Sequence, residues 1–222
     1  MAEMFREAEE LVFSGGPTKA EEAADTQPKS PSRWALVRHD KRQDILMHKM
    51  RYKSTSFDVL RAEGTLPFAM NDVWNVVCDM ENRPKIDPDM TAVNEVVGCI
   101  DRDMFVTHTV TQKIFFLQPR EFLTIDYRGD LRSRQGKMLV MQSLEPTSRN
   151  GGWSAAVPHT SGTCSGTIHL VALAVFPEGS STKLVYICCS DPGGWVPAWA
   201  VNAGLEQSGG IVAKLRAYML RR

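Results

Sequence analysis

The segment TKLVYICCSDPGGWVPAWAVN, residues 182–202, joins a predicted strand to the last helix of the chain. Its first half is rich in branched and aromatic residues, which favour a strand over 183–190. Glycine and proline then predict a turn, and a helix follows Pro197 and ends the chain. Positions that step alternately by four and three residues give this helix one apolar stripe, formed by Val201, Leu205, Ser208, Val212, Leu215 and Met219.

The remainder of the chain predicts an antiparallel sheet with a few helices. A short amphipathic helix is expected over Met4–Phe13, and Asn71 or Asp72 can cap another helix. Residues 81–89 contain two prolines and allow at most one more short helix. Strand patterns recur over 34–39, 45–52, 57–66, 92–99, 103–111, 121–131, 136–144 and 163–176. Hairpin-length connections favour an α+β architecture, in which a curved antiparallel sheet wraps the long C-terminal helix and leaves a space between them.

Composition and charge describe an ordinary globular protein of 222 residues. Because 26 Lys and Arg balance 26 Asp and Glu, the sequence argues against nucleic-acid binding and against a polybasic membrane anchor. It contains no run of eighteen apolar residues and no secretory signal. Five cysteines without disulfide or zinc spacing indicate free thiols in a reducing compartment. We therefore expect a cytoplasmic monomer that contacts membranes transiently.

Three segments carry a family resemblance in chain order: DMENRPKID at residues 79–87, MFVTHTVTQKIFFLQPREFLTIDYRGDL at 104–131, and DPGGWVP at 191–197. They resemble the signatures of START domains, the lipid-transfer domains related to the steroidogenic acute regulatory protein, although Ile86 stands where a Trp is usual. The likeness is nearest to the branch that carries phosphatidylcholine and ceramide. It implies a helix-grip fold with one lipid in an interior tunnel, whose lid is the C-terminal helix and one loop.

The resemblance and the composition together divide the chain into three parts. Residues 1–14 form the N-terminal helix of the domain, and residues 33–222 form the START lipid-binding domain. Between them, the Gly-, Pro- and Lys/Glu-containing residues 15–32 predict a flexible linker or insertion.

A mouth that touches the bilayer is predicted from two apolar segments. Phe115, Phe116 and Leu117 lie in a loop that ends at a proline, and Trp195 and Trp199 follow the glycines of the last turn. Large apolar and amphipathic rings suit the boundary between water and lipid. The alternative for the loop is an ordinary strand end packed in the core.

Three glycines, Gly204, Gly209 and Gly210, lie inside the predicted C-terminal helix. Each costs about 0.8–1.0 kcal/mol relative to Ala, so the helix is weak near its middle. Either its backbone packs closely against the sheet, or it loosens to admit a ligand.

Four residues are candidates for the lipid site. By resemblance, Arg83 matches a position that contacts lipid phosphate, and a guanidinium suits a phosphate because it presents a fixed fork of donors. Thr109, Asp126 and His169 lie at strand positions that the resemblance directs inward. A buried Asp needs a partner, for which Arg83 and His169 are candidates. The alternatives are a surface arginine, a solvated strand aspartate and a satisfied core histidine.

The sequence thus predicts a non-vesicular transfer protein that extracts, shields and delivers one lipid, first a phospholipid such as phosphatidylcholine. A ceramide carrier, a sterol carrier and a lipid sensor are alternatives. A helix-grip hydrolase or thioesterase is less favoured, because no G-x-S-x-G, H-E-x-x-H or nucleotide-binding motif is present, although Asp126 and His169 would suit an acid–base pair. We expect no catalytic residues, no metal, no cofactor beyond the bound lipid and no nucleic-acid partner.

Overall fold

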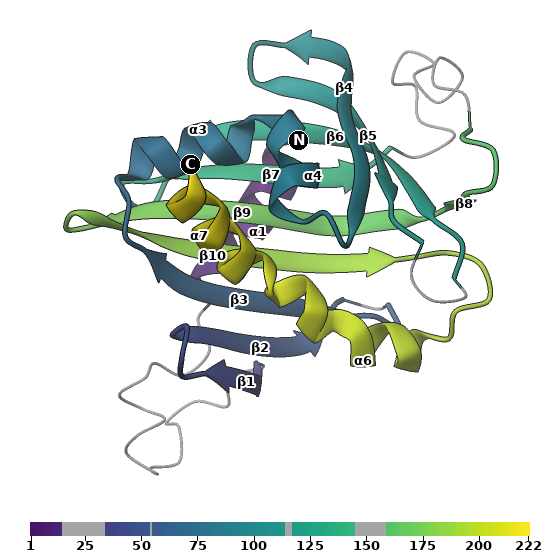
Figure 1. The fold of residues 1–222 in the computed structure, drawn as a ribbon, viewed down its shortest axis with the longest axis horizontal. Coiled ribbons are helices and arrows are strands. Elements are labelled where there is room, and N and C mark those ends of the chain that lie inside the picture. The colour runs from purple at the N-terminus through teal and green to yellow at the C-terminus, as the bar shows by residue number, and fades with distance from the viewer. Residues whose placement is uncertain (15–33, 54, 114–116, 145–158) are drawn as a thin grey trace.

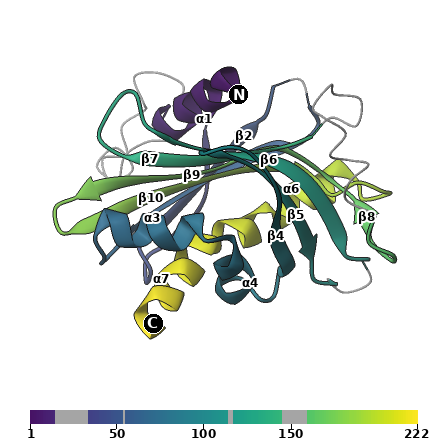
Figure 2. The same cartoon turned by 90° about the horizontal axis from the view of Figure 1, so that it is seen from above.

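One large curved sheet forms the body of the protein, and helices cover both of its faces (Figures 1 and 2). The computed structural model describes residues 1–14, 34–53, 55–113, 117–144 and 159–222, so the predicted linker at 15–32 lies outside the described residues. Helix α1 (Ala2–Phe13) covers one face, here called the outer face (Figure 2). The opposite, inner face is covered by α3 (Met70–Cys78), α4 (Arg83–Ile86), α6 (Ala198–Gly209) and α7 (Ile211–Arg221).

The sheet is antiparallel apart from one short strand, and its order is β1-β2-β3-β10-β9-β7-β6-β5-β4, with β8 paired in parallel to β6. The bounds are β1 (Ala35–Asp40), β2 (Ile45–Arg51), β3 (Asp58–Leu66), β4 (Thr91–Asp101), β5 (Met104–Thr111), β6 (Arg120–Asp130), β7 (Lys137–Ser143), β8 (Cys164–Ser165), β9 (Thr167–Glu178) and β10 (Ser181–Asp191). Strand β10 pairs with β3, with Tyr186 opposite Ala62, and thereby joins the first three strands to the rest of the sheet.

The predicted elements are confirmed, with two differences in how they are divided. The strand expected at 163–176 splits at Gly166, where a Cβ would lie 2.4 Å from the ring of Phe122. The C-terminal helix is broken into α6 and α7 at Gly210. Residues 80–86 form the short 3-10 helix η1 (Met80–Asn82) followed directly by α4.

Both faces of the sheet are buried, and the strands alternate between two hydrophobic clusters. In β10, the inner cluster takes Leu184, Tyr186 and Cys188, and the outer cluster takes Val185, Ile187 and Cys189. Helix α1 seals the outer cluster, where the ring of Phe5 meets Tyr127 edge-on at 5.4 Å between centroids. The carboxylate of Glu9 accepts hydrogen bonds from the backbone N–H groups of Arg132 and Ser133. These contacts fix α1 to the sheet.

The glycines of the C-terminal helices have different surroundings. Gly209 is buried against the sheet, where a Cβ would lie 2.9 Å from Met47 Sδ and 3.2 Å from Leu60. A Cβ at Gly204 would meet nothing within 4 Å. Close packing therefore accounts for Gly209, whereas nothing in the surroundings of Gly204 requires a glycine.

This difference predicts opposite outcomes for two alanine substitutions. Gly204→Ala should raise the free energy of unfolding by about 0.5–1 kcal/mol, because alanine favours the helix and space is open. Gly209→Ala should be less stable than Gly204→Ala, because its methyl group displaces Met47 from a close-packed core. Urea unfolding of both variants measures this. Equal stability of the two variants would contradict the packing argument.

Candidate functional site

A cavity of about 270 Å³ lies between the inner face of the sheet and helices α3, α4 and α7. Its volume is near the lower end of the range for small-molecule sites. The walls are mostly apolar and are formed by Val76, Val77, Met80, Ile86, Met90, Leu117, Phe122, Leu139, Met141, Ile168, Val171, Leu173, Pro192, Ile211 and Leu215. The polar lining residues are Asp79, Arg83, Thr91, Asn94, Thr109, Thr111, Gln112, Gln118, Arg120, Tyr186, Cys188 and Ser190.

The cavity reaches solvent beside the segment that ends β5 and begins β6. Gln112 and Gln118 are exposed and line the cavity next to Leu117, and Pro192 lines it from the turn after β10. We call these four residues the mouth. Asp79, which follows the last residue of α3, is the third exposed residue among the described lining residues.

Arg83 lies in the cavity wall because α4 is tied to α7. Tyr218 Oη donates to Asn82 Oδ1 at 2.8 Å, and Lys214 Nζ donates to Asp87. These two bonds bracket α4 at its start and end, and Arg83 at its first position lines the cavity. The structure thus places Arg83 in the cavity wall, and its contact with a lipid phosphate stays a prediction.

Arg83 shares a polar corner of the cavity with Tyr186 and Cys188. Burial raises the pKa of Tyr186 well above its ordinary value, while the nearby Arg83 guanidinium opposes that rise. Burial likewise raises the pKa of the Cys188 thiol. Both groups are neutral at physiological pH, so Arg83 is the charged group of this corner.

Arg120 braces the mouth, and the sequence analysis did not single it out. Its Nε donates to the Pro192 carbonyl at 3.1 Å, and its Nη1 donates to the Gln118 carbonyl. Its own backbone N–H donates to Thr111 Oγ1 at 2.8 Å. One side chain thus holds the segment before β6 against the turn after β10. The sequence feature that could have identified Arg120 is its position just before the strand predicted at 121–131, within the quoted segment 104–131.

Thr109 lines the cavity as expected, and its hydroxyl already has a partner. Thr109 Oγ1 donates to Asn94 Oδ1 at 2.6 Å, and Asn94 Nδ2 donates to the Met80 carbonyl at 3.1 Å. A ligand that binds Thr109 would therefore either donate to the hydroxyl oxygen or displace Asn94 from the hydroxyl hydrogen.

Asp126 is fully buried but does not line the cavity. Thr107 Oγ1 and Thr124 Oγ1 donate to its carboxylate at 2.9 and 2.6 Å. Burial raises the pKa of Asp126 to about 6, while the two hydroxyl groups and the charge of Arg128 oppose the rise. The expected partners Arg83 and His169 are therefore wrong, and two threonines on the same face satisfy this aspartate.

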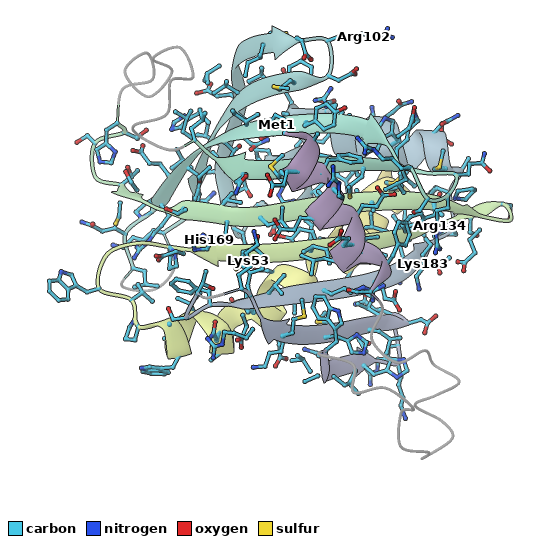
Figure 3. All side chains as sticks on the ribbon, turned by 180° about the vertical axis from the view of Figure 1, so that it is seen from behind. Met1, Lys53, Arg102, Arg134, His169 and Lys183 are labelled. Carbon is cyan, nitrogen blue, oxygen red and sulfur yellow. The ribbon has the colours of Figure 1, made fainter. Side chains whose placement is uncertain are left out.

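His169 lies on the outer face, so its expected inward placement is wrong. His169 is labelled in Figure 3, which views the face that α1 covers. Its ring centroid lies 5.7 Å from that of Phe57 and 6.3 Å from that of Tyr52, and the rings are tilted to each other. The pairing of β9 with β10 shifts register between Cys189 and Ser190, so no residue of β10 stands opposite His169. Such a bulge reverses the alternation of side chains. Ile168 consequently faces the cavity where simple alternation from Val171 would place His169.

The predicted membrane-contact residues fall into three groups. Trp195 is 101% exposed and Trp199 is 75% exposed, both near the start of α6. Leu117 is half-buried and lines the cavity at the mouth. Phe115 and Phe116 lie outside the described residues.

Comparisons with known proteins identify relatives of the whole chain. The model of the START domain family matches residues 19–220. The structure of human StAR-related lipid transfer protein 5 has a TM-score of 0.75 at 18% identity and covers 100% of this chain and 99% of its own. Human STARD10 has a TM-score of 0.72 at 13% identity, with 93% of this chain and 81% of its own chain covered.

A bacterial structure shares the same architecture. The STAR-related lipid transfer protein fragment from Xanthomonas axonopodis has a TM-score of 0.70 at 16% identity and covers 86% of this chain and 99% of its own. A comparison with curated proteins gives no match. At these identities the structures show the fold, and they confirm the predicted helix-grip architecture.

The raised pKa of Asp126 predicts a pH-dependent contribution to stability. A carboxyl whose pKa rises from 3.8 to about 6 on folding favours the folded state at low pH, and this contribution is lost as pH rises through 6. Asp126→Asn removes the charge and nearly keeps the shape; its oxygen accepts from one threonine hydroxyl and its NH2 group donates to the other. Relative to the unsubstituted protein, its free energy of unfolding should rise by about 3 kcal/mol between pH 4 and pH 8.

Urea unfolding across this pH range measures the difference. Asp130→Asn is the matched control, because Asp130 lies at the end of the same strand with 80% of its side chain exposed. Parallel pH curves for Asp126→Asn and the unsubstituted protein would contradict the assignment.

Proposed function

The chain belongs to the START domain family, and on that basis we propose that it is a lipid-transfer protein that holds one lipid in the cavity on the inner face. The observation that carries this proposal is a mostly apolar cavity between the sheet and the C-terminal helix α7, with a charged polar corner at Arg83. The names of the relatives, StAR-related lipid transfer proteins, agree with it.

An apolar interior is what lipid extraction requires. Each methylene that leaves a bilayer costs about 0.8 kcal/mol, so two acyl chains of sixteen carbons cost on the order of 25 kcal/mol unless they are shielded again. The side chains of α7 and the sheet supply such shielding. The ligand that we propose first is a phospholipid, because Arg83 suits a phosphate and faces the cavity without an ion pair in the described part of the chain.

A non-enzymatic role is part of the proposal. The pair that would serve acid–base chemistry, Asp126 and His169, is divided between the two faces of the sheet. The threonine hydroxyls occupy the carboxylate of Asp126, and aromatic rings cover His169. Neither residue lines the cavity, so neither supports hydrolysis of a bound lipid.

Transient contact with a membrane surface is proposed for the side of the molecule that carries the mouth. Exposed Trp195 and Trp199 stand near the turn that Arg120 ties to the mouth. Leu117, together with Phe115 and Phe116 of the same segment, would enter the interface beside them.

A cytoplasmic location is also proposed, on the basis of the free thiols. All five cysteines are free, as in a reducing compartment. In the described residues, no helix is long and apolar enough to cross a membrane.

Native mass spectrometry of the purified protein tests the proposal directly. We expect one lipid bound per chain after incubation with mixed vesicles, and extraction then identifies it. A protein that takes up no lipid from vesicles containing phospholipids, ceramide and sterol would refute lipid transfer.

Replacing the two exposed tryptophans should slow transfer. Trp195→Ala with Trp199→Ala should lower the rate of vesicle-to-vesicle transfer about tenfold, because two interfacial rings are lost. The folded state should be unaffected, since both side chains are exposed. Ile100→Ala is the control, because Ile100 is 43% exposed on β4, the edge strand farthest from β3 in the sheet order. Equal transfer rates in the double variant and the control would contradict this membrane contact.

A further inference from the structure

The lining of the cavity carries an excess of positive charge. In the described part of the chain, its only charged residues are Arg83, Arg120 and Asp79. Asp79 is exposed, and its Oδ1 accepts the Glu81 backbone N–H that begins η1. The two arginines therefore dominate the field inside the cavity, because an exposed carboxylate is screened by water.

Neither arginine is neutralised by the protein. No ion pair joins Arg83 or Arg120 to a carboxylate among the described residues. Arg120 is only 9% exposed, and its guanidinium donates to two neutral backbone carbonyls, those of Pro192 and Gln118. A buried guanidinium without a counter-charge is costly, so its presence in a ligand cavity indicates that the ligand supplies the negative charge.

The described walls offer little to a choline group. Quaternary ammonium groups are bound by cages of aromatic rings, with help from carboxylates. Here the aromatic lining residues are Phe122 and Tyr186, and Asp79 is the sole acid. Arg83 stands beside Tyr186, so a positive headgroup at that ring would meet a positive charge.

The two positive charges lie at different positions along the cavity wall. Arg83 lies by Tyr186 and Cys188, and Arg120 bonds to the carbonyl of Pro192. At about 3.3 Å per residue, Cys188 and Pro192 are separated by roughly 13 Å along the chain. An anionic group that enters at the mouth meets Arg120 first and Arg83 farther along the cavity wall.

Resting on the proposed function, we propose that the carried lipid has a net negative charge, on phosphate or carboxylate oxygens, and that Arg120 selects it against zwitterionic choline lipids. Arg120 acts as a specificity-determining residue at the mouth, in addition to bracing the two segments. Within the described residues its Nη2 has no protein acceptor and is free to donate to an anionic oxygen.

Competition within a single vesicle population tests this selectivity. Vesicles of equal parts dioleoyl phosphatidylcholine and dioleoyl phosphatidylglycerol are incubated with the full chain, and native mass spectrometry of the re-isolated protein gives the ratio of the two bound lipids. Both lipids share one surface, so recruitment to the membrane does not bias the ratio. We expect phosphatidylglycerol to exceed phosphatidylcholine about tenfold, the effect of one charge-assisted hydrogen bond.

A parallel incubation adds oleate to the same vesicles and separates the two sources of negative charge. Displacement of phosphatidylglycerol by oleate would assign the site to a carboxylate, and its retention would assign it to a phosphate. A protein filled mainly with phosphatidylcholine would overturn the selectivity and leave lipid transfer intact, whereas a protein that takes up neither phospholipid nor oleate would refute both.

Two variants distinguish the role of Arg120 in lipid selection from its role in holding the two mouth segments together. Arg120→Gln should lower the ratio of phosphatidylglycerol to phosphatidylcholine about tenfold, and Arg120→Lys, which keeps the charge, should retain most of the preference. A merely structural Arg120 would change the uptake of both lipids equally, and an unchanged ratio in Arg120→Gln would overturn its role. The ratio in the unsubstituted protein decides the charge preference even if Arg120→Gln does not fold.

Discussion

The pairing of β3 with β10 is the interaction on which the cavity depends. It joins the first three strands to the rest of the sheet, and α6 follows the last strand after the turn at residues 192–197. Helices α6 and α7 both contact β3 and β10, so this pair of strands is the floor beneath them. The inner face then stays partly hollow while α1 packs tightly against the outer face. Dense packing on the outer face offsets the van der Waals contacts that are missing around the cavity on the inner face.

Charged groups in the core and in the cavity wall differ in whether the protein itself supplies their partners. Inside the body of the fold, acids are satisfied by the chain itself: Glu9 accepts from backbone N–H groups, Asp126 accepts from two threonines, and Asp87 pairs with Lys214. In the cavity wall, Arg83 and Arg120 have no such counter-charge among the described residues. Because an uncompensated buried charge weakens a fold, this contrast is the physical basis for the anionic ligand proposed above.

Features that follow from local sequence patterns agree with the structure, whereas features that depend on contacts between distant residues were not predicted. Strand ends and the placement of Arg83 and Thr109 follow from local pattern and from the family motifs, and the structure agrees with them. His169 fails because one bulge in β9 reverses the alternation, and a bulge leaves no mark in a pattern of apolar residues. Arg120 was overlooked because its partners, the carbonyls of Gln118 and Pro192, are backbone groups without a sequence signature.

By itself, the sequence determined the architecture: a strand, a Gly-Pro turn and an apolar helical stripe at 182–219 require a sheet that grips its last helix. This works because periodicity records which side of each element is buried. Only the tertiary structure decided which polar side chains meet. Asp126 accepts a hydrogen bond from Thr107 on the neighbouring strand, and Asn82 accepts one from Tyr218. Arg120 donates to the carbonyls of Gln118 and Pro192, which are far apart in the chain. The physical reason is that hydrogen bonds act over about 3 Å between residues far apart in the chain, so the register of the sheet has to form before these partners exist.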